Sequence, residues 1–286
     1  MKRLTIQLFN YWLVLLFLSG CSNEITLQPS SSGETVRLGK LVTRTGAGGE
    51  QEWQWRENDV ITATTSGSSS LTATYTYGSG GQWGEASNAD FTIEKIGVDA
   101  ITLEFGSSTL TTDQSDAAKY RQADYLKGEG SISLLTLGGT LGHQHCDLVL
   151  TITKGTGWAS ETEFNNAMAD ASCVFVAGSG GGTTDLTPFH SGNTFRAILP
   201  PENMVKGLSQ KIATLTFGTT DNTPLLLRGH TATIAYTNEV PELKNKRFIV
   251  NALLNTDCSV SITASINAWN TEDVTKPYPG EPEATN

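Results

Sequence analysis

Apolar and polar residues alternate along most of the chain, which is the pattern of β-strands that bury one face. In residues 259–269, SVSITASINAW, the even positions from Val260 to Ala268 are apolar and the odd positions up to Asn267 are polar. Shorter alternating segments lie at residues 71–77, 91–93, 101–105, 148–152 and 231–236. Glycine-rich turns separate many of them, as at residues 78–81, 138–139 and 178–182. Short strands at this spacing predict a mainly β fold built from β-sandwiches.

One segment departs from the two-residue period. Residues 160–163, SETE, form a capping box, in which the serine and glutamate side chains bond to free N–H groups of a first helical turn. Phe164, Ala167, Met168 and Ala171 then follow at helical spacing. This spacing predicts one short helix with one buried face.

The first twenty residues have the pattern of a bacterial lipoprotein signal peptide. Lys2 and Arg3 precede an apolar run at residues 11–18 that is too short to span a membrane. Residues 18–21, LSGC, then resemble a lipobox, in which the cysteine takes a diacylglyceryl group and the chain is cut before it. We therefore expect Cys21 to be lipidated, with two or three acyl chains giving firm anchoring. The alternative is an ordinary signal peptide followed by a chance cysteine.

The rest of the chain suggests two domains between flexible ends. Residues 21–35 are polar and rich in serine, which predicts a tether. We expect an N-terminal β-sandwich at residues 36–156 and a C-terminal one at residues 157–269, divided between a strong strand and the predicted helix. Residues 270–286 contain three prolines and predict a flexible tail. One large β domain is the alternative.

The chain is acidic, and this bears on its partners. Without residues 1–20, which hold Lys2, Arg3 and no acidic residue, 17 of the 19 basic side chains remain against 29 acidic ones, a net charge of −12. Phosphate neutralisation needs a basic surface, so nucleic acid is not an expected partner. An acidic, charge-repelled body is typical of an exported surface protein.

The sequence offers little chemistry. It contains no G-x-S-x-G elbow, no H-E-x-x-H motif and no P-loop, so we expect neither enzyme activity nor a cofactor. His143 and His145 beside Cys146 form a histidine cluster without standard zinc spacing, and we expect no metal there. Cys146, Cys173 and Cys258 can form at most one disulfide, and we expect them mainly as buried small side chains.

Five tryptophans keep a second function open. Aromatic rings of this kind stack on sugars in glycan-binding sandwiches, although single tryptophans more often fill cores. A surface glycan-binding lipoprotein is therefore the alternative function, and it would require coplanar exposed rings. The five candidates are Trp53, Trp55, Trp83, Trp158 and Trp269.

Several stretches, taken in order, resemble the fimbrillin family, the pilins of Bacteroidales-type fimbriae. They cover nearly the whole chain after the lipobox. The first stretch begins with a Thr-Arg segment, which a tryptophan and a turn follow. The turn, Asn58-Asp59-Val60, departs from the family, in which Gly-Asp is usual. The stretches are TRTGAGGEQEWQWRENDVI at residues 43–61, RQADYLKGEG at 121–130, GHQHCDLVLTITKGTG at 142–157, FRAILPPENM at 195–204 and INAW at 266–269.

The resemblance implies a structural or adhesive subunit of a cell-surface fimbria with two transthyretin-like β-sandwich domains and no enzyme activity. Such subunits reach the outer membrane as lipoproteins, and a trypsin-like protease then removes the lipid and the first strand. The opened groove takes a strand from a neighbouring subunit. The partners implied are other fimbrial subunits, the outer membrane through the lipid on Cys21, and host or bacterial surface ligands.

By its match to the family position, the cut falls after Arg44, with Arg37 as the fallback. Residues 36–43 alternate well enough to form the strand that would be removed, and glycines follow Arg44 in an accessible stretch. The alternative is that Arg44 is an ordinary surface cation. A stalk subunit must also donate a strand, for which residues 248–254 and 259–269 are candidates. A subunit that keeps both would be a tip or accessory pilin.

Overall fold

A computed structural model describes residues 33–44, 50–52, 54–67, 69–179, 182–204, 210–236 and 243–269. The chain divides into two compact units, residues 1–34 and residues 35–286, and every strand among the described residues belongs to the second unit. Strands dominate the described residues, which confirms the predicted mainly β fold. No helix among these residues is both long and apolar enough to cross a membrane.

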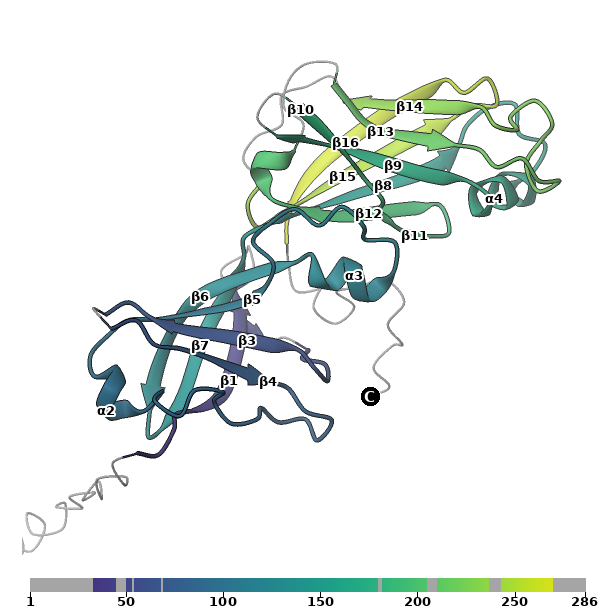
Figure 1. Ribbon diagram of the computed structural model, residues 1–286. Coiled ribbons are helices and arrows are strands. Elements are labelled where there is room, and N and C mark those ends of the chain that lie inside the picture. Colours follow the sequence, from purple (N-terminus) through teal and green to yellow (C-terminus); the bar gives the residue numbers. More distant parts are fainter. Residues whose placement is uncertain are drawn as a thin grey trace, which may run out of the picture. The chain divides into compact units, whose positions relative to one another are not determined.

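The first seven strands form one sheet in the order β2-β1-β7-β6-β5-β3-β4 (Figure 1). Strand β1 runs parallel to β7, and the other neighbours are antiparallel. The Tyr75 hydroxyl in β4 donates to the Val36 carbonyl just before β1, although four strands lie between β4 and β1. This contact shows that the sheet curls. The bounds are β1 (Arg37–Arg44), β2 (Glu50–Glu52), β3 (Val60–Thr65), β4 (Thr72–Thr76), β5 (Ile101–Gly106), β6 (Tyr125–Ser133) and β7 (Thr136–His143).

The remaining strands form a β-sandwich of a five-stranded sheet, β11-β12-β8-β15-β16, and a four-stranded sheet, β10-β9-β13-β14 (Figure 1). One apolar core lies between them, with Leu150, Phe195 and Val250 from one sheet and Phe175 and Leu215 from the other. The bounds are β8 (Cys146–Lys154), β9 (Ser172–Ser179), β10 (Gly182–Leu186), β11 (Phe189–Ser191), β12 (Thr194–Leu199), β13 (Gln210–Thr216), β14 (Thr231–Tyr236), β15 (Lys246–Leu254) and β16 (Val260–Ala268).

The predicted N-terminal sandwich, residues 36–156, would have contained β8. The sheet pairings instead place β8 in the C-terminal sandwich. Strand β8 pairs with β12 and β15, and its inward side chains belong to the core of the sandwich. The change of sheet therefore falls between His143 and Cys146. An alternating strand looks the same whichever sheet it joins, so the sequence pattern could not assign it.

The predicted helix is α4 (Glu161–Ala169), and its capping box is present. The Ser160 hydroxyl accepts from the Glu163 N–H at 3.0 Å, and the Glu163 carboxylate accepts from the Ala159 N–H at 2.7 Å. The prediction of a single helix is incomplete, because the structure adds α2 (Ile93–Ile96), α3 (Ala117–Gln122) and a 3-10 turn at Pro201–Asn203. Elements shorter than two turns carry no apolar repeat that could reveal them.

Strand β16 has the predicted alternation, but its apolar side is only half-buried. Its pairing within the described residues is with β15 alone, at the edge of the five-stranded sheet. By contrast, β15 lies between β8 and β16 and buries Phe248 and Val250 fully. An edge position leaves one flank of a strand open to solvent, which explains the half-buried side chains.

The cysteines of the described residues form no disulfide. Cys146 and Cys173 are buried and Cys258 is half-buried, which confirms two of the three expected burials. Burial raises the pKa of the Cys146 and Cys173 thiols. These two behave as small core side chains.

Candidate functional site

Two of the fimbrillin-like stretches meet at an ion pair between Asp59 and Arg121. Both side chains are largely buried, and the Arg121 guanidinium also donates to the Gln54 carbonyl at 3.2 Å. The Arg56 N–H donates to the Asp59 carboxylate at 2.8 Å, which closes the turn. Asn58 has a φ of 69°, a left-handed conformation that asparagine tolerates better than most residues. This explains how Asn-Asp can replace Gly-Asp.

Two further motif residues, Asp124 and Trp269, meet at His143. Its Nδ1 lies 2.9 Å from an Asp124 carboxylate oxygen, and both side chains are buried. The Trp269 ring stacks on the imidazole at 3.8 Å and 6°. His145 points elsewhere, with its Nδ1 2.9 Å from the Ala123 carbonyl oxygen. Among the described residues, no three histidine, cysteine or acidic side chains gather in a way that could hold a metal ion.

A third cluster centres on Asp147, which is fully buried in β8. Its carboxylate accepts from the Tyr120 hydroxyl at 2.7 Å, from Arg196 at 2.5 Å and from Arg247 at 2.6 Å. Burial alone would raise the pKa of the Asp147 carboxyl, but the two guanidinium charges outweigh it and hold the pKa below its ordinary value. These buried contacts join strands to one another and to helix α3 as structural scaffolding.

Strand β1 is the predicted removable strand, and the structure shows how it is held. It pairs with β7 over Arg37–Thr43 and with β2 over Val42–Arg44. A bulge between Leu38 and Leu41 turns both leucines into the core, although an odd number of positions along the strand would otherwise place them on opposite faces. Thr43 is buried as well. The first sheet therefore depends on β1 for backbone pairing and for part of its core.

The predicted modification sites stay predictions. Cys21 lies outside the described residues. Arg44 ends β1 with its backbone opposite Glu50, and both its side chain and residues 45–49 lie outside the description. Arg37 begins β1, has an exposed side chain, and donates its N–H to the Leu135 carbonyl at 2.8 Å.

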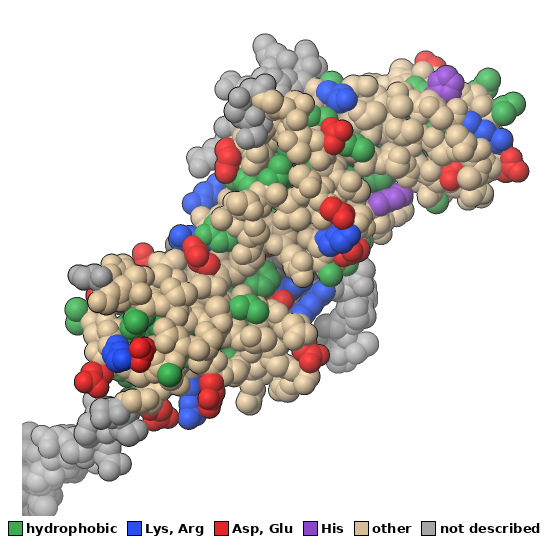
Figure 2. Space-filling model, viewed as in Figure 1, with side chains coloured by type: hydrophobic (Ala, Val, Ile, Leu, Met, Phe, Trp, Pro, Cys, Tyr) green, Lys and Arg blue, Asp and Glu red, His purple; other side chains and the backbone are tan. Residues whose placement is uncertain are grey.

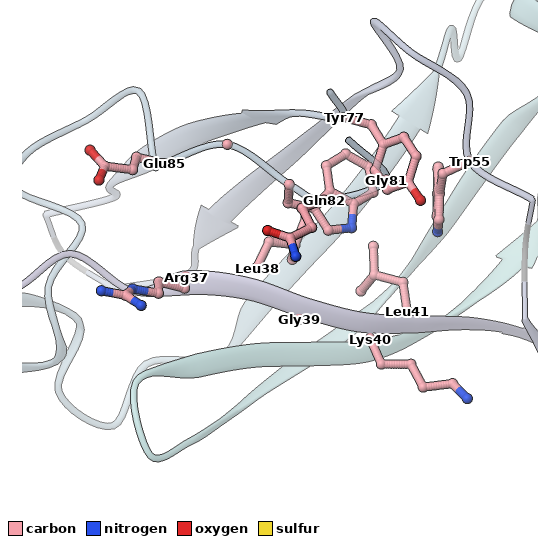
Figure 3. A pocket seen from close by; sticks show the side chains of 12 residues that line it. Arg37, Leu38, Gly39, Lys40, Leu41, Trp55, Tyr77, Gly81, Gln82 and Glu85 are labelled. Carbon is pink, nitrogen blue, oxygen red and sulfur yellow. The ribbon is translucent and has the colours of Figure 1, made fainter. Parts of the chain in front are cut away.

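A groove of about 550 Å³ runs along β1. Figure 3 shows Leu41 facing Trp55 and Tyr77 across it, whereas the Lys40 side chain points away. The Gln82 amide points into the groove toward β1 (Figure 3). The full lining is Arg37, Leu38, Gly39, Lys40, Leu41, Trp55, Tyr77, Gly81, Gln82, Trp83, Gly84 and Glu85.

The aromatic side of the groove is built edge to face. The Trp55 and Trp83 rings lie 4.9 Å apart at 67°, and the Tyr77 and Trp83 rings lie 5.0 Å apart at 66°. Trp55 also meets the Phe105 ring at 5.6 Å, and the Arg121 guanidinium lies over the same Phe105 ring, 5.5 Å from its centroid. The buried Arg121–Asp59 pair thus supports the segment that carries Trp55.

A tight hairpin places Tyr77 opposite Trp83. The Gly78 N–H donates to the Gln82 carbonyl at 2.9 Å, and the Gly81 N–H donates to the Gly78 carbonyl at 3.0 Å. Gly81 has a φ of 75°, which favours glycine at this position. The predicted glycine-rich turn therefore brings two aromatic rings together.

The structure describes four of the five candidate tryptophans, and they lie in different surroundings. Trp55 and Trp83 line the groove half-buried. Trp158 is buried in the sandwich core, where its indole N–H donates to the Leu254 carbonyl at 2.8 Å, and Trp269 is buried against His143. Trp53 lies outside the described residues. The sequence reasoning missed Tyr77 and Gln82, for which the glycine-rich turn between paired aromatics was the available signal.

The face of the molecule in Figure 2 shows basic side chains scattered beside acidic ones rather than gathered in a patch. Exposed ion pairs such as Lys95–Asp90 and Lys119–Asp113 likewise set basic side chains beside acidic ones. On this face, then, there is no basic stripe of the kind that tracks a phosphate backbone.

No family model and no curated protein sequence matches the chain. Solved structures do match, among them two from Bacteroides species. A "putative cell adhesion protein" from Bacteroides ovatus ATCC 8483 matches with a TM-score of 0.53 and 14% identity, over 85% of this chain and 100% of that one. A second, from Bacteroides uniformis ATCC 8492, matches with a TM-score of 0.50 and 14% identity, over 81% of this chain and 97% of that one. The chain shares the fold of these proteins. The likeness is one of fold, and it agrees with the resemblance seen in the sequence motifs.

Proposed function

We propose that this chain is a structural and adhesive subunit of a cell-surface fimbria, exported as a lipoprotein through Cys21 and assembled by proteolysis and strand exchange. The observation that carries the proposal is β1, a first strand that lies within a sheet and ends at Arg44. Two solved structures of like fold carry the description "putative cell adhesion protein", which supports a role at the cell surface. In this proposal the chain is not an enzyme.

Loss of β1 would make the first sheet unstable on its own. Burying a leucine side chain is worth about 1.5–3 kcal/mol, so losing Leu38 and Leu41 would cost about 3–6 kcal/mol. The paired backbone groups of β7 would lose their partners in addition. Because a domain is stable by only about 5–15 kcal/mol in total, the trimmed chain needs a replacement strand. A strand of a neighbouring subunit would supply it by β-augmentation.

The two candidate donor strands differ in how they are held. Releasing β15 would split the five-stranded sheet between β8 and β16, because β15 is a central strand. Releasing β16 would break one set of pairings and expose apolar side chains that are already half-exposed. If the subunit donates a strand, we infer that it donates β16. A subunit that keeps β16 in place is a tip or accessory pilin.

Limited trypsin digestion tests the proposal. The wild-type chain, Arg44→Ala and Arg37→Ala are digested, the products are identified by N-terminal sequencing, and their sizes are measured by size-exclusion chromatography. We expect the first cut after Arg44, polymers from the trimmed wild type and from Arg37→Ala, and a monomer from Arg44→Ala. A chain that is cut after Arg44 and stays a stable monomer would exclude strand exchange. If the chain resists cutting after Arg44 and polymerises anyway, the processing site lies at another residue.

A further inference from the structure

The groove along β1 has a feature that the fimbrial proposal does not use. Its aromatic rings are half-exposed although they pack against each other. In addition, the Tyr77 hydroxyl, the Trp83 indole N–H and the Gln82 amide form no hydrogen bond with any described residue. Donors and acceptors that line a concave aromatic site and have no partner among the described residues are available to a ligand.

From this geometry we infer that the groove is a binding site for a short neutral oligosaccharide. A pyranose ring has an apolar C–H face and a rim of hydroxyl groups. The faces of Trp55, Tyr77 and Trp83 can cover the apolar side, and the Gln82 amide can both donate to and accept from hydroxyl groups. The volume of about 550 Å³ falls within the range of roughly 300–1,000 Å³ for ligand sites.

The angles between the rings define the kind of contact. The rings meet at 66–67°, so they form walls rather than the coplanar platform that the sequence analysis required for a glycan binder. Walls suit a bent oligosaccharide or a chain end that enters the groove, and they do not suit a flat polymer surface. Arg37 and Glu85 carry opposite charges at one end of the groove (Figure 3). Their balance favours a neutral ligand over a strongly charged one.

The site is held rigidly before any ligand arrives. The hairpin hydrogen bonds around Gly78 fix Tyr77 and Trp83, and the buried Arg121–Asp59 pair supports the segment of Trp55. Preorganisation of this kind reduces the entropy that binding must overcome. The inference goes beyond the proposed function and concerns the intact chain, so it stands or falls independently of strand exchange.

The test uses the intact chain on an array of immobilised neutral gluco-, manno- and galacto-oligosaccharides, followed by calorimetric titration with the best-bound sugar. We expect binding to quench tryptophan fluorescence, because two tryptophans line the groove. Gln82→Ala should weaken binding about tenfold, which corresponds to about 1.4 kcal/mol, and Trp83→Ala should weaken it further. The Gln82 side chain is exposed and forms no hydrogen bond with any described residue, so truncating it leaves the fold intact even if Trp83→Ala does not.

Gln122→Ala is the matched control, because Gln122 is an exposed amide outside the groove and should leave affinity within about twofold. Failure of the folded wild-type chain to bind any sugar on the array would overturn the inference. Equal binding by wild type and Gln82→Ala would also overturn it. A synthetic peptide of residues 259–269 serves as a second probe. If the groove bound this peptide and no sugar, it would be a strand-docking site.

Discussion

The Tyr75 hydroxyl donates a 2.8 Å hydrogen bond to the Val36 carbonyl oxygen, and both residues are fully buried. This bond joins β4 at one edge of the first sheet to the residue that leads into β1. It closes the curled sheet at the strand whose removal the proposed assembly requires. The strength of this closure bears directly on how readily β1 can leave.

Tyr75→Phe should destabilise the chain by about 1–3 kcal/mol, because it leaves a buried carbonyl without its donor. Chemical denaturation measures the change. Tyr236→Phe is the control, since Tyr236 is half-buried in β14 and its hydroxyl has no described partner, and it should change stability by less than about 0.5 kcal/mol. Equal stability of Tyr75→Phe and wild type would show that this bond does not hold the sheet closed.

The same tyrosine predicts a dependence on alkaline pH. Burial raises the pKa of Tyr75 to about 12, so the folded state keeps a proton that the unfolded state releases near pH 10. Its contribution to stability is complete below pH 10 and is lost as pH rises from about 10 to about 12. Between about pH 10 and about pH 12, the free energy of unfolding should decrease less steeply with pH for Tyr75→Phe than for wild type. Chemical denaturation at several pH values measures this. The same dependence on pH in both proteins would show that Tyr75 is not the group responsible.

Asp147→Asn should cost about 3–5 kcal/mol, because it leaves Arg196 and Arg247 charged and largely buried without their shared carboxylate. Asp221→Asn is the matched control, since Asp221 pairs with Arg228 while fully exposed and should contribute less than about 1 kcal/mol. The lowered pKa of Asp147 also makes wild-type stability fall as pH drops below the ordinary aspartate range near 4. If both variants unfold at the same denaturant concentration, the cluster is not a structural anchor.

Cys21→Ser should abolish acylation and leave an unprocessed or released precursor, which mass spectrometry of the membrane and soluble fractions would detect. Cys258→Ser is the control, because this half-buried cysteine forms no disulfide and should leave acylation unchanged. An intact exported wild-type chain with an unmodified Cys21 thiol would refute lipidation.

Leu41→Ala should cost about 2–5 kcal/mol, because Leu41 is only 2% exposed in β1. The loosened strand should then be cut faster by trypsin than the wild-type strand. Val42→Ala removes a neighbouring half-buried side chain and should have a smaller effect on both measurements. Identical cutting rates in all three proteins would mean that the packing of β1 does not control processing.

Much of the fold followed from local patterns. The two-residue period predicted β8, β14 and β16, and the capping box at Ser160 predicted α4. The bulge in β1 escaped prediction because it depends on pairing with β7, and the half-burial of β16 escaped because an edge position is a property of the whole sheet. Long-range contacts such as Arg121 with Asp59 were equally hidden, although the motifs that contain both residues were found.

The candidate site, too, was only partly predictable from the sequence. Trp55 and Trp83 were named from sequence, yet nothing in the sequence distinguished them from Trp158, which is a core residue. The groove exists because a glycine turn and a curled sheet bring Tyr77, Gln82 and β1 together. Such convergence is set by tertiary structure, and residue type alone does not reveal it.

The most direct test of the central claim is the N-terminal sequence of this subunit recovered from assembled surface fibres. We expect fibres whose subunits begin at Thr45, without Cys21 and without β1. Subunits in the fibre that still begin at an acylated Cys21 and retain β1 would contradict assembly by removal of the first strand.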